Sequence, residues 1–371
     1  MKPVRLPFIA NLALVLISIV IIGYLLRLGQ TILAPFFLAF LLAMLFVPFA
    51  NWLERKLKFS RGVSSITALV LVFAALSGLG YFFGSQFAAF SDDIPHLTEQ
   101  FNEIFQSFQQ WVSRTFQLDV DKQFEFLEQG LNKLLSSSGF IIGVTLAYFS
   151  TSLGFAFFCL LFFVFILNYR KGLNNFIINI FPDKHKEKVS ETVHEIQSMT
   201  KSYITGICIQ MLLITFLSTS VLLLFGVKYA ILLGVLTGLI NVIPYLGIAI
   251  AMLLASFITF ATATPITVLY VTIGYLVIHA IDGNIIIPFI VGSKVKINAL
   301  FSFLAILIGA ELWGISGMFL CIPALAILKI VFERIEAIQP WGNVLGESGK
   351  KKKDTKKKIK ISKKIVIESK D

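Results

Sequence analysis

Charged residues are scarce in this sequence: they make up 14% of its 371 residues, whereas apolar residues make up 57%. A soluble globular domain carries about 25% charged residues, so the composition excludes an ordinary soluble protein. A Gly-rich loop ending in Gly-Lys-Ser or Gly-Lys-Thr is missing, which argues against an ATP-driven pump in this chain. Cysteine is rare, and Cys159, Cys208 and Cys321 lie inside apolar runs without the spacing of metal ligands. We therefore expect no metal site and no cofactor.

Two short motifs of enzymes are incomplete. His194 and Glu195 begin a metalloprotease HExxH motif, but Ser198 stands where the second histidine belongs. The stretch GISG (314–317) matches the short motif of rhomboid-type intramembrane serine proteases, and His279 could serve as its base. In that family the histidine follows the serine, and here no histidine follows Ser316. We expect no catalytic residues and no enzyme, and an intramembrane serine protease is the less favoured alternative.

Long apolar runs fill most of the chain. A hydrocarbon core of about 30 Å needs about 20 apolar residues to be crossed by a helix. Runs of that length lie at about 8–28, 31–50, 63–84, 141–167 and 203–226, and an almost continuous run extends from 229 to 333. The pattern predicts an all-α polytopic membrane protein with about six to eight transmembrane helices.

Most of the positive charge lies in the C-terminal tail. The formal net charge is +11, and residues 350–371 account for +8 of it through eleven lysines against Asp354, Glu368 and Asp371. This tail lacks the interleaved aromatic residues that stack on bases, so we expect no nucleic-acid partner. We predict that 336–371 is a disordered, Lys-rich cytoplasmic tail.

Charge also predicts the orientation of the chain. The loop after the second run carries Arg55, Lys56, Lys58 and Arg61, which places it and both termini in the cytoplasm. We expect three transmembrane helices in 1–90, an extracytoplasmic segment at 91–140, and a transport core at 141–335. The spacing of apolar residues predicts amphipathic helices in the extracytoplasmic segment, which pack against the membrane surface, against each other or against another subunit. A cytoplasmic surface helix is predicted at 183–202.

The long C-terminal run is interrupted twice. NVIPYLG (241–247) contains Pro244, Tyr245 and Gly247, and GAELWGISG (309–317) contains Gly314 and Gly317. Proline removes a helical hydrogen bond, and glycine adopts backbone angles closed to other residues. Each interruption therefore predicts a pair of half-helices, which are either re-entrant hairpins or two ordinary short spans. Broken helices of this kind form solute and ion sites in secondary transporters.

A third stretch, 274–292, places polar residues inside an apolar run. His279 and Asp282 are three residues apart and share a helix face, and Pro288 leaves the carbonyl of Asn284 without its helical donor. A carboxylate inside a span must be paired, protonated or bound to a cation. We expect a substrate or ion site built from His279, Asp282 and Asn284, with Glu311 as a second buried carboxylate. The alternatives are that Asp282 caps a helix break and that Glu311 caps the turn at 314–317.

The helix-break positions are expected to act in gating. They are Pro244, Tyr245, Gly247, Pro288, Gly314 and Gly317.

Three motifs in this order resemble the AI-2E family of bacterial permeases. They are IPYLG (243–247), DGNIIIPFIVG (282–292) and GAELWGISGMFLCIPALAILK (309–329). The resemblance implies a permease of the bacterial inner membrane; members are described as exporters of autoinducer-2 or as sodium or lithium/proton antiporters. This chain departs from the pattern at INAL (297–300), where many members have LHPL, and at Ile248 and Ile250, where Pro and Gly are common. The substrate therefore does not carry over.

Together these features predict a secondary transporter, multi-pass in the bilayer and homo-oligomeric. It would move a small solute or a monovalent cation between the cytoplasm and the outside. A non-transporting membrane scaffold is the alternative, which a flux assay in liposomes separates from a carrier.

The orientation can be tested with accessible tags. A tag at residue 57 or in the lysine tail should be reached only from the cytoplasm, and a tag near residue 118 only from outside, because basic loops are retained inside. Labelling of intact cells with an impermeant reagent measures this, and the reverse pattern would overturn the orientation.

Overall fold

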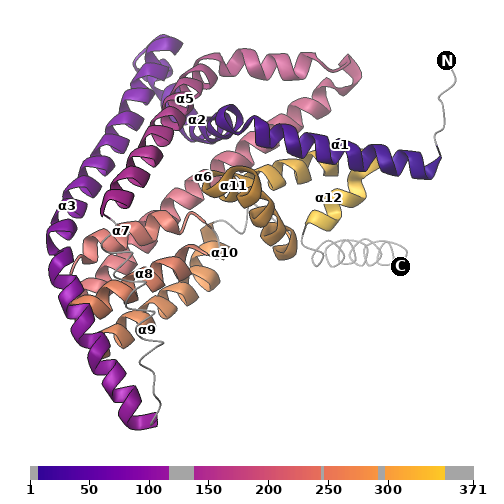
Figure 1. Cartoon of the computed structure of the whole chain (residues 1–371). Coiled ribbons are helices and arrows are strands. Elements are labelled where there is room, and N and C mark those ends of the chain that lie inside the picture. Colours follow the sequence, from indigo (N-terminus) through magenta and orange to yellow (C-terminus); the bar gives the residue numbers. More distant parts are fainter. Residues whose placement is uncertain (1–6, 117–137, 244–245, 291–296, 347–371) are drawn as a thin grey trace, which may run out of the picture. The chain divides into compact units, whose positions relative to one another are not determined.

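The computed structural model describes four stretches of the chain, residues 7–116, 138–243, 246–290 and 297–346 (Figure 1). Its side chains are described for 7–90, 110, 152–243, 246–289 and 297–346. Within these stretches the secondary structure consists of helices joined by turns, without a strand. The predicted all-α class is confirmed.

Seven helices of the described stretches are long and apolar enough to cross a membrane. They are α1 (Phe8–Leu28), α2 (Gln30–Lys56), α3 (Arg61–Phe116), α5 (Ser138–Asn179), α6 (Asp183–Leu224), α9 (Pro265–Ile281) and α11 (Ala299–Arg334). Helix α9 continues through a π-helical turn η1 (Asp282–Ile286) into α10 (Ile287–Ile290), and the span Pro265–Phe289 includes all three elements. The number agrees with the prediction of six to eight spans.

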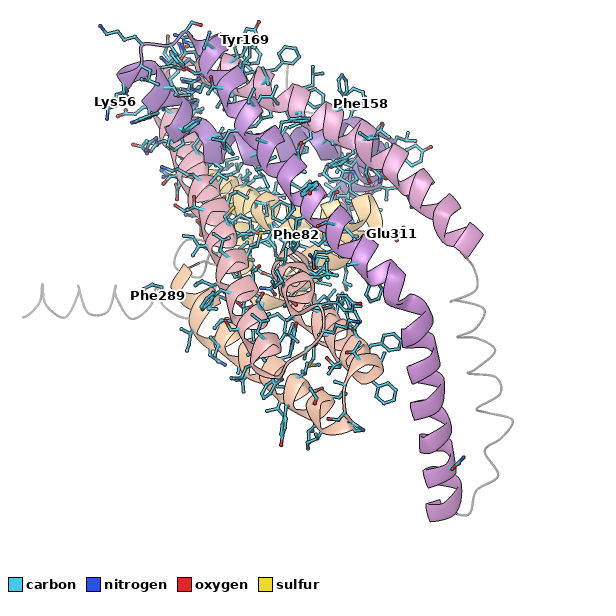
Figure 2. The ribbon with its side chains drawn as sticks, turned by 90° about the vertical axis from the view of Figure 1, so that its left-hand side faces the viewer. Lys56, Phe82, Phe158, Tyr169, Phe289 and Glu311 are labelled. Carbon is cyan, nitrogen blue, oxygen red and sulfur yellow. The ribbon has the colours of Figure 1, made fainter. Side chains whose placement is uncertain are left out.

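Large apolar side chains cover the outside of these helices, as a lipid environment requires. None of the residues of α1 is buried. Phe158 and Phe289 point away from the ribbon (Figure 2), and Phe289 is 86% exposed. The chain is a polytopic membrane protein.

The chain divides into two compact units. Unit 1 consists of Met1–Met44, Tyr169–Ile204 and Val291–Asp371, and unit 2 of Leu45–Asn168 and Thr205–Ile290. Helices α2, α5 and α6 each contribute residues to both units.

Two helices are longer than the sequence pattern indicated. Helix α3 passes residue 90 without a break, so the expected division between 1–90 and 91–140 falls inside one helix. The side chains of 91–109 and the segment 117–137 lie outside the described residues, and the amphipathic segment stays a prediction. The expected surface helix at 183–202 is the first part of α6, continuous with the following span.

The core of unit 2 is built by α6, α7 (Ala230–Ile240), α8 (Gly247–Thr262) and α9. Helix α7 approaches α6 closely because two of its residues are glycines. A Cβ atom at Gly234 would overlap Thr219, and one at Gly238 would overlap Thr215. The backbone of α7 at these two glycines therefore lies directly against the threonine side chains of α6.

The first predicted break is confirmed. Helix α7 ends at Ile240 and α8 begins at Gly247, and Pro244 and Tyr245 between them lie outside the described residues. The two helices have 11 and 16 residues, about 17 and 24 Å, which is less than the bilayer core. A Cβ atom at Gly247 would overlap the backbone of Ile240 and Asn241, so the turn requires glycine.

The second predicted break is also present, in the middle of α11. Trp313 has φ −137° and ψ 20°, and Gly314 has φ 60° and ψ −138°, in the region that favours glycine. A Cβ atom on either Gly309 or Gly317 would meet the carbonyl group of the other. Residues eight apart in a straight helix are separated by about 12 Å, so this contact means that α11 folds back on itself as a hairpin.

The disordered tail was predicted to begin at residue 336, which is wrong because the chain is still helical there. Residues 336–345 form a 3-10 turn and α12 (Gln339–Leu345). Helix α12 packs on α11 because Gly342 lacks a side chain and can lie against the backbone of Glu333. The Asn298 N–H also donates to the Leu345 carbonyl at 2.9 Å. Residues 347–371 lie outside the described residues.

The hairpin of α11 predicts a severe effect of Gly317→Ala. The added methyl group meets backbone, which cannot rotate away, so we expect a loss of at least about 2 kcal/mol of stability. Gly23→Ala in α1 is the matched control, because nothing lies within 4 Å of its position for a Cβ atom. Its stability should rise by up to about 1 kcal/mol from helix propensity. Melting temperatures in detergent measure both, and equal effects would contradict the hairpin.

Candidate functional site

The candidate site centres on Asp282, where the span of α9 widens into a π-helical turn. The N–H of Ile287 donates to the carbonyl of Asp282, five residues back, instead of four. Pro288 follows immediately and contributes no N–H, so the span changes its hydrogen-bond register here without breaking. Such π turns inside α-helices occur frequently at functional sites.

The carboxylate of Asp282 points into unit 2 and is 4% exposed. One oxygen accepts a hydrogen bond from Gln210 Nε2 of α6 at 2.8 Å. The other accepts from Asn241 Nδ2, at the end of α7, at 3.4 Å. We call Asp282, Gln210 and Asn241 the acid cluster. Because its partners are side chains of two other helices, the carboxylate is not occupied in capping its own helix.

Among the described residues, the two side-chain hydrogen bonds to this carboxylate come from neutral amides. Within the described residues, no lysine or arginine forms an ion pair with Asp282. An ionised carboxylate is costly in an apolar span unless a proton or a cation balances its charge. The amide groups suit both states, since each can donate to a carboxylate or turn and accept from a protonated acid. The acid cluster can therefore lose and regain a positive charge without leaving a polar group unpaired.

His279 and Asn284 do not join the acid cluster in this structure. Both side chains are exposed. The amide of Asn284 donates to the carbonyl of Ala280 on its own helix at 2.8 Å. The residues lie within one turn of Asp282 along the span, but the structure brings only the acid to Gln210 and Asn241. A role of His279 and Asn284 in binding stays a prediction.

Gln210 and Asn241 were not among the site residues predicted from the sequence. A signal was available for each: Gln210 is an amide inside the apolar run 203–226, and Asn241 opens the NVIPYLG interruption. Both are buried at 8% exposure. Pairing them with Asp282 requires the packing of three helices, which spacing along one helix does not reveal.

Glu311, the second predicted carboxylate, belongs to unit 1 and is exposed. It lies at the tip of the α11 hairpin and forms an ion pair with Arg27 of α1 at 3.1 Å. Next to it, Trp313 Nε1 donates to the carbonyl of Leu26 at 2.8 Å, and the Trp313 ring stacks on Phe37. The hairpin tip is thus attached to the end of α1 and the beginning of α2. A binding role for Glu311 stays a prediction.

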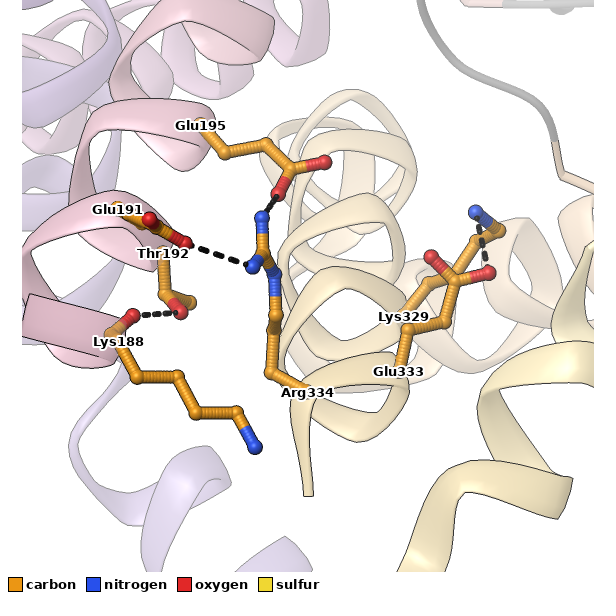
Figure 3. A network of polar contacts seen from close by, with 7 residues as sticks. All are labelled: Lys188, Glu191, Thr192, Glu195, Lys329, Glu333 and Arg334. Atoms are coloured by element: carbon orange, nitrogen blue, oxygen red, sulfur yellow. Dashed lines mark hydrogen bonds and ion pairs between the residues drawn. The ribbon is translucent and has the colours of Figure 1, made fainter. Parts of the chain in front are cut away.

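A second polar network lies at the other end of α11 (Figure 3). Arg334 donates to Glu191 at 3.1 Å and to Glu195 at 2.7 Å, both on α6. Lys329 forms an ion pair with Glu333 one turn away, at 3.1 Å. These two bonds of Arg334 tie the end of α11 to α6 within unit 1.

Comparison with known proteins identifies relatives that match most of this sequence. A family model described as AI-2E family transporter matches residues 12–337. YrrI of Bacillus subtilis is 26% identical over 311 residues, covering 81% of this chain and 86% of YrrI. MT0215 of Mycobacterium tuberculosis is 25% identical, covering 89% and 90% of the two chains. PerM of Escherichia coli is 25% identical over 45% of this chain and 47% of PerM. YrrI and MT0215 are described as transport proteins and PerM as a permease, and none of the three descriptions names a substrate.

The acid cluster predicts unequal effects of removing two amides. Gln210→Met deletes a donor to a buried carboxylate and should lower stability by about 1–3 kcal/mol. Asn284→Leu removes an exposed amide that bonds only its own helix, and should change stability by less than about 0.5 kcal/mol. Melting of the purified protein in detergent measures both. Equal losses of stability in the two variants would show that the hydrogen bond from Gln210 to Asp282 does not stabilise the protein.

Proposed function

The chain belongs to the AI-2E family of transporters, and we propose that it is a secondary transporter in which Asp282 is the coupling carboxylate. The family membership makes it a membrane permease. We further propose that it lies in the bacterial inner membrane with both termini in the cytoplasm, as the basic loops predict.

The observation that supports this mechanism most is the burial of Asp282 among neutral partners. The carboxylate is 4% exposed, inside an apolar span, and hydrogen-bonded to two amides. An unbalanced charge there costs about 3 kcal/mol on insertion scales. A proton or a monovalent cation that binds at Asp282 offsets this cost, so the occupancy of the site can follow an ion gradient, which coupled transport requires.

The position of Asn241 links the acid to the first helix break. Asn241 ends α7 directly before the turn that reverses the chain into α8. When Asp282 exchanges its proton or cation, the hydrogen bond to Asn241 must rearrange, and this bond connects the acid to the mouth of the α7–α8 hairpin. Broken helices with freed carbonyls and helix ends are the usual surroundings of such sites in secondary transporters.

The cargo is either a small polar solute or a monovalent cation. Export of autoinducer-2 and exchange of sodium for protons are the two activities that the family resemblance suggests. Both need a titratable group in the membrane if they draw on the proton gradient. Flux into liposomes under an imposed pH or sodium gradient, screened against cations and polar metabolites, identifies the cargo; the absence of any flux would favour a scaffold.

We also propose a homo-oligomer. Helix α1 is apolar on all sides and has no buried residue, and the predicted amphipathic segment at 91–140 offers a further surface for subunit contact. Lipid covers such faces in a monomer, so the oligomeric state is measured in native lipid discs by mass determination.

Asp282→Asn tests the coupling role. The change keeps volume and hydrogen bonding but removes the titratable charge, so the protein should insert and assemble while gradient-driven flux falls roughly tenfold or more. A tenfold loss corresponds to only about 1.4 kcal/mol of lost interaction. Asp183→Asn is the matched control, since it neutralises a carboxylate at the start of α6 whose side chain is 94% exposed, and should keep flux within about twofold.

Wild-type flux with an unaltered pH profile in Asp282→Asn would reject the coupling role. Equal losses in Asp282→Asn and Asp183→Asn would show that both variants damage the protein in a general way. The first result would leave transport itself intact as the function.

A further inference from the structure

A second buried hydrogen bond joins two of the helices that carry the acid cluster. The hydroxyl oxygens of Thr237 on α7 and Tyr275 on α9 are 2.8 Å apart, and the two residues are 1% and 0% exposed. Among the described residues, this bond and the bond from Asn241 to Asp282 are the two side-chain hydrogen bonds between the segments 230–241 and 265–282. They are therefore the polar contacts that join α7 directly to the α9 span.

The direction of the bond between the two hydroxyls can be assigned. Thr237 Oγ1 donates to the carbonyl of Leu233 at 2.7 Å, and a threonine has only one hydroxyl hydrogen. Tyr275 is therefore the donor in its bond with Thr237. When the tyrosine hydroxyl is removed, Thr237 keeps its bond to the backbone and no donor of this contact is left without an acceptor. Tyr275→Phe consequently deletes the contact at a small structural cost.

The two hydrogen bonds follow one another along the same helix faces. Asn241 comes four residues after Thr237, and Asp282 comes seven residues after Tyr275. Residues at these spacings share one face of a helix. The first pair is separated by about one turn, or 6 Å, and the second pair by about two turns, or 10 Å. The bond between Thr237 and Tyr275 thus lies one turn of α7 before Asn241.

The bond from Asn241 is the one in the acid cluster that is most sensitive to the position of α7. Gln210 donates to Asp282 at 2.8 Å, whereas Asn241 donates at 3.4 Å. Bonds from N–H to oxygen usually measure about 2.7–3.2 Å, and a contact of about 3.6 Å is no longer a hydrogen bond. A displacement of α7 away from α9 by a few tenths of an ångström would therefore release Asn241 from the carboxylate.

The remaining packing of α7 involves other neighbours. Gly234 and Gly238 bring α7 against Thr219 and Thr215 of α6. Helix α8 packs against both α7 and α9. These contacts hold α7 to α6 and to α8. The long side chain of Tyr275 supplies the direct connection to α9.

We propose that Tyr275 is a positioning residue of the acid cluster: its hydrogen bond to Thr237 holds α7 at the distance from α9 at which Asn241 reaches Asp282. Tyr275 makes this bond two turns away from the carboxylate and acts on it through α7. The consequence for transport rests on the proposed function, in which this contact helps to set how tightly Asp282 holds its proton or cation.

The other groups that face Asp282 stay the same in the test. Among the described residues, His279 of the same helix is the titratable side chain whose charge acts on Asp282. Helices α6 and α7 present Gln210 and Asn241, which do not titrate. Because His279 is present in every variant, differences between the variants report hydrogen bonds.

Infrared titration of the purified full chain in lipid tests the proposal without any cargo. The bands of Asp282 are those that Asp282→Asn removes, and their intensities against pH give the midpoint at which the acid exchanges its proton. Hydrogen bonds to an ionised acid are about twice as strong as those to a neutral one. Tyr275→Phe should therefore move the midpoint to higher pH by about half a unit, a roughly threefold change in proton affinity.

A double-variant cycle tests the route of this effect. Asn241→Leu removes the donor itself and should also move the midpoint to higher pH. In the Asn241→Leu background, Tyr275→Phe should have no further effect, because the side chain that it positions is gone. Thr237→Val removes the acceptor on α7, keeps the branched shape, and should reproduce the shift of Tyr275→Phe.

Tyr270→Phe is the matched control. It removes a half-exposed phenol from the same helix and keeps the ring that stacks on Phe225. Its midpoint should equal that of the wild type.

Two results would overturn the proposal. The first is an Asp282 midpoint that is the same in the wild type, Tyr270→Phe and Tyr275→Phe. The second is a Tyr275→Phe shift that persists in full in the Asn241→Leu background, since Tyr275 would then act by another route. Neither result decides the coupling role of Asp282, which is tested separately by flux in Asp282→Asn.

Discussion

A carboxylate cannot remain in hydrocarbon without compensation, and this constraint explains the construction around Asp282. The side chain is buried in unit 2, where Gln210 and Asn241 supply hydrogen bonds but no charge. Amides of this kind reduce the cost of burial but leave the charge itself unbalanced, and in the proposed mechanism a proton or a cation balances it. A lysine in place of Gln210 would neutralise the acid permanently, and the site would no longer have two states of similar free energy. The choice of amides over cations is what makes the cluster chemically reversible.

The same constraint applies to the backbone, and glycine meets it at both helix breaks. Carbonyl groups freed by a turn must find donors inside the protein. At the end of α1 the carbonyl of Leu26 accepts from the indole of Trp313, so one break supplies the donor that a neighbouring helix end lacks. Gly247 in unit 2 and the pair Gly309 and Gly317 in unit 1 permit chain reversals in which any side chain would overlap backbone. In each unit, therefore, the chain reverses at a helix break where only glycine fits.

Features that depend on local chemistry were predictable from the sequence. Both helix breaks were predicted because proline and glycine act on the residues next to them, and Asp282 stood out because a carboxylate is rare in an apolar run. Gln210 and Asn241 were missed because their role arises from contacts 72 and 41 residues distant in sequence. Glu311 was predicted to be buried from its apolar neighbours, yet it is exposed and paired with Arg27, a contact that depends on the hairpin at Gly314. The start of the tail was misplaced because α12 is held by its packing on α11 at Gly342, a contact that local composition does not reveal.

The π-helical turn at Asp282 has a dynamic consequence. Such a turn is equivalent to one residue inserted into an α-helix. It moves along the helix when one backbone N–H exchanges the carbonyl five residues back for the carbonyl four residues back. Shifting the insertion by one position turns the residue it passes by about 100° around the helix axis. Only one backbone bond needs to be exchanged at each step, and the rest of the span keeps its place. A side chain at this turn can therefore leave a buried environment by rotation of its own residue about the helix axis. No helix needs to slide through the bilayer.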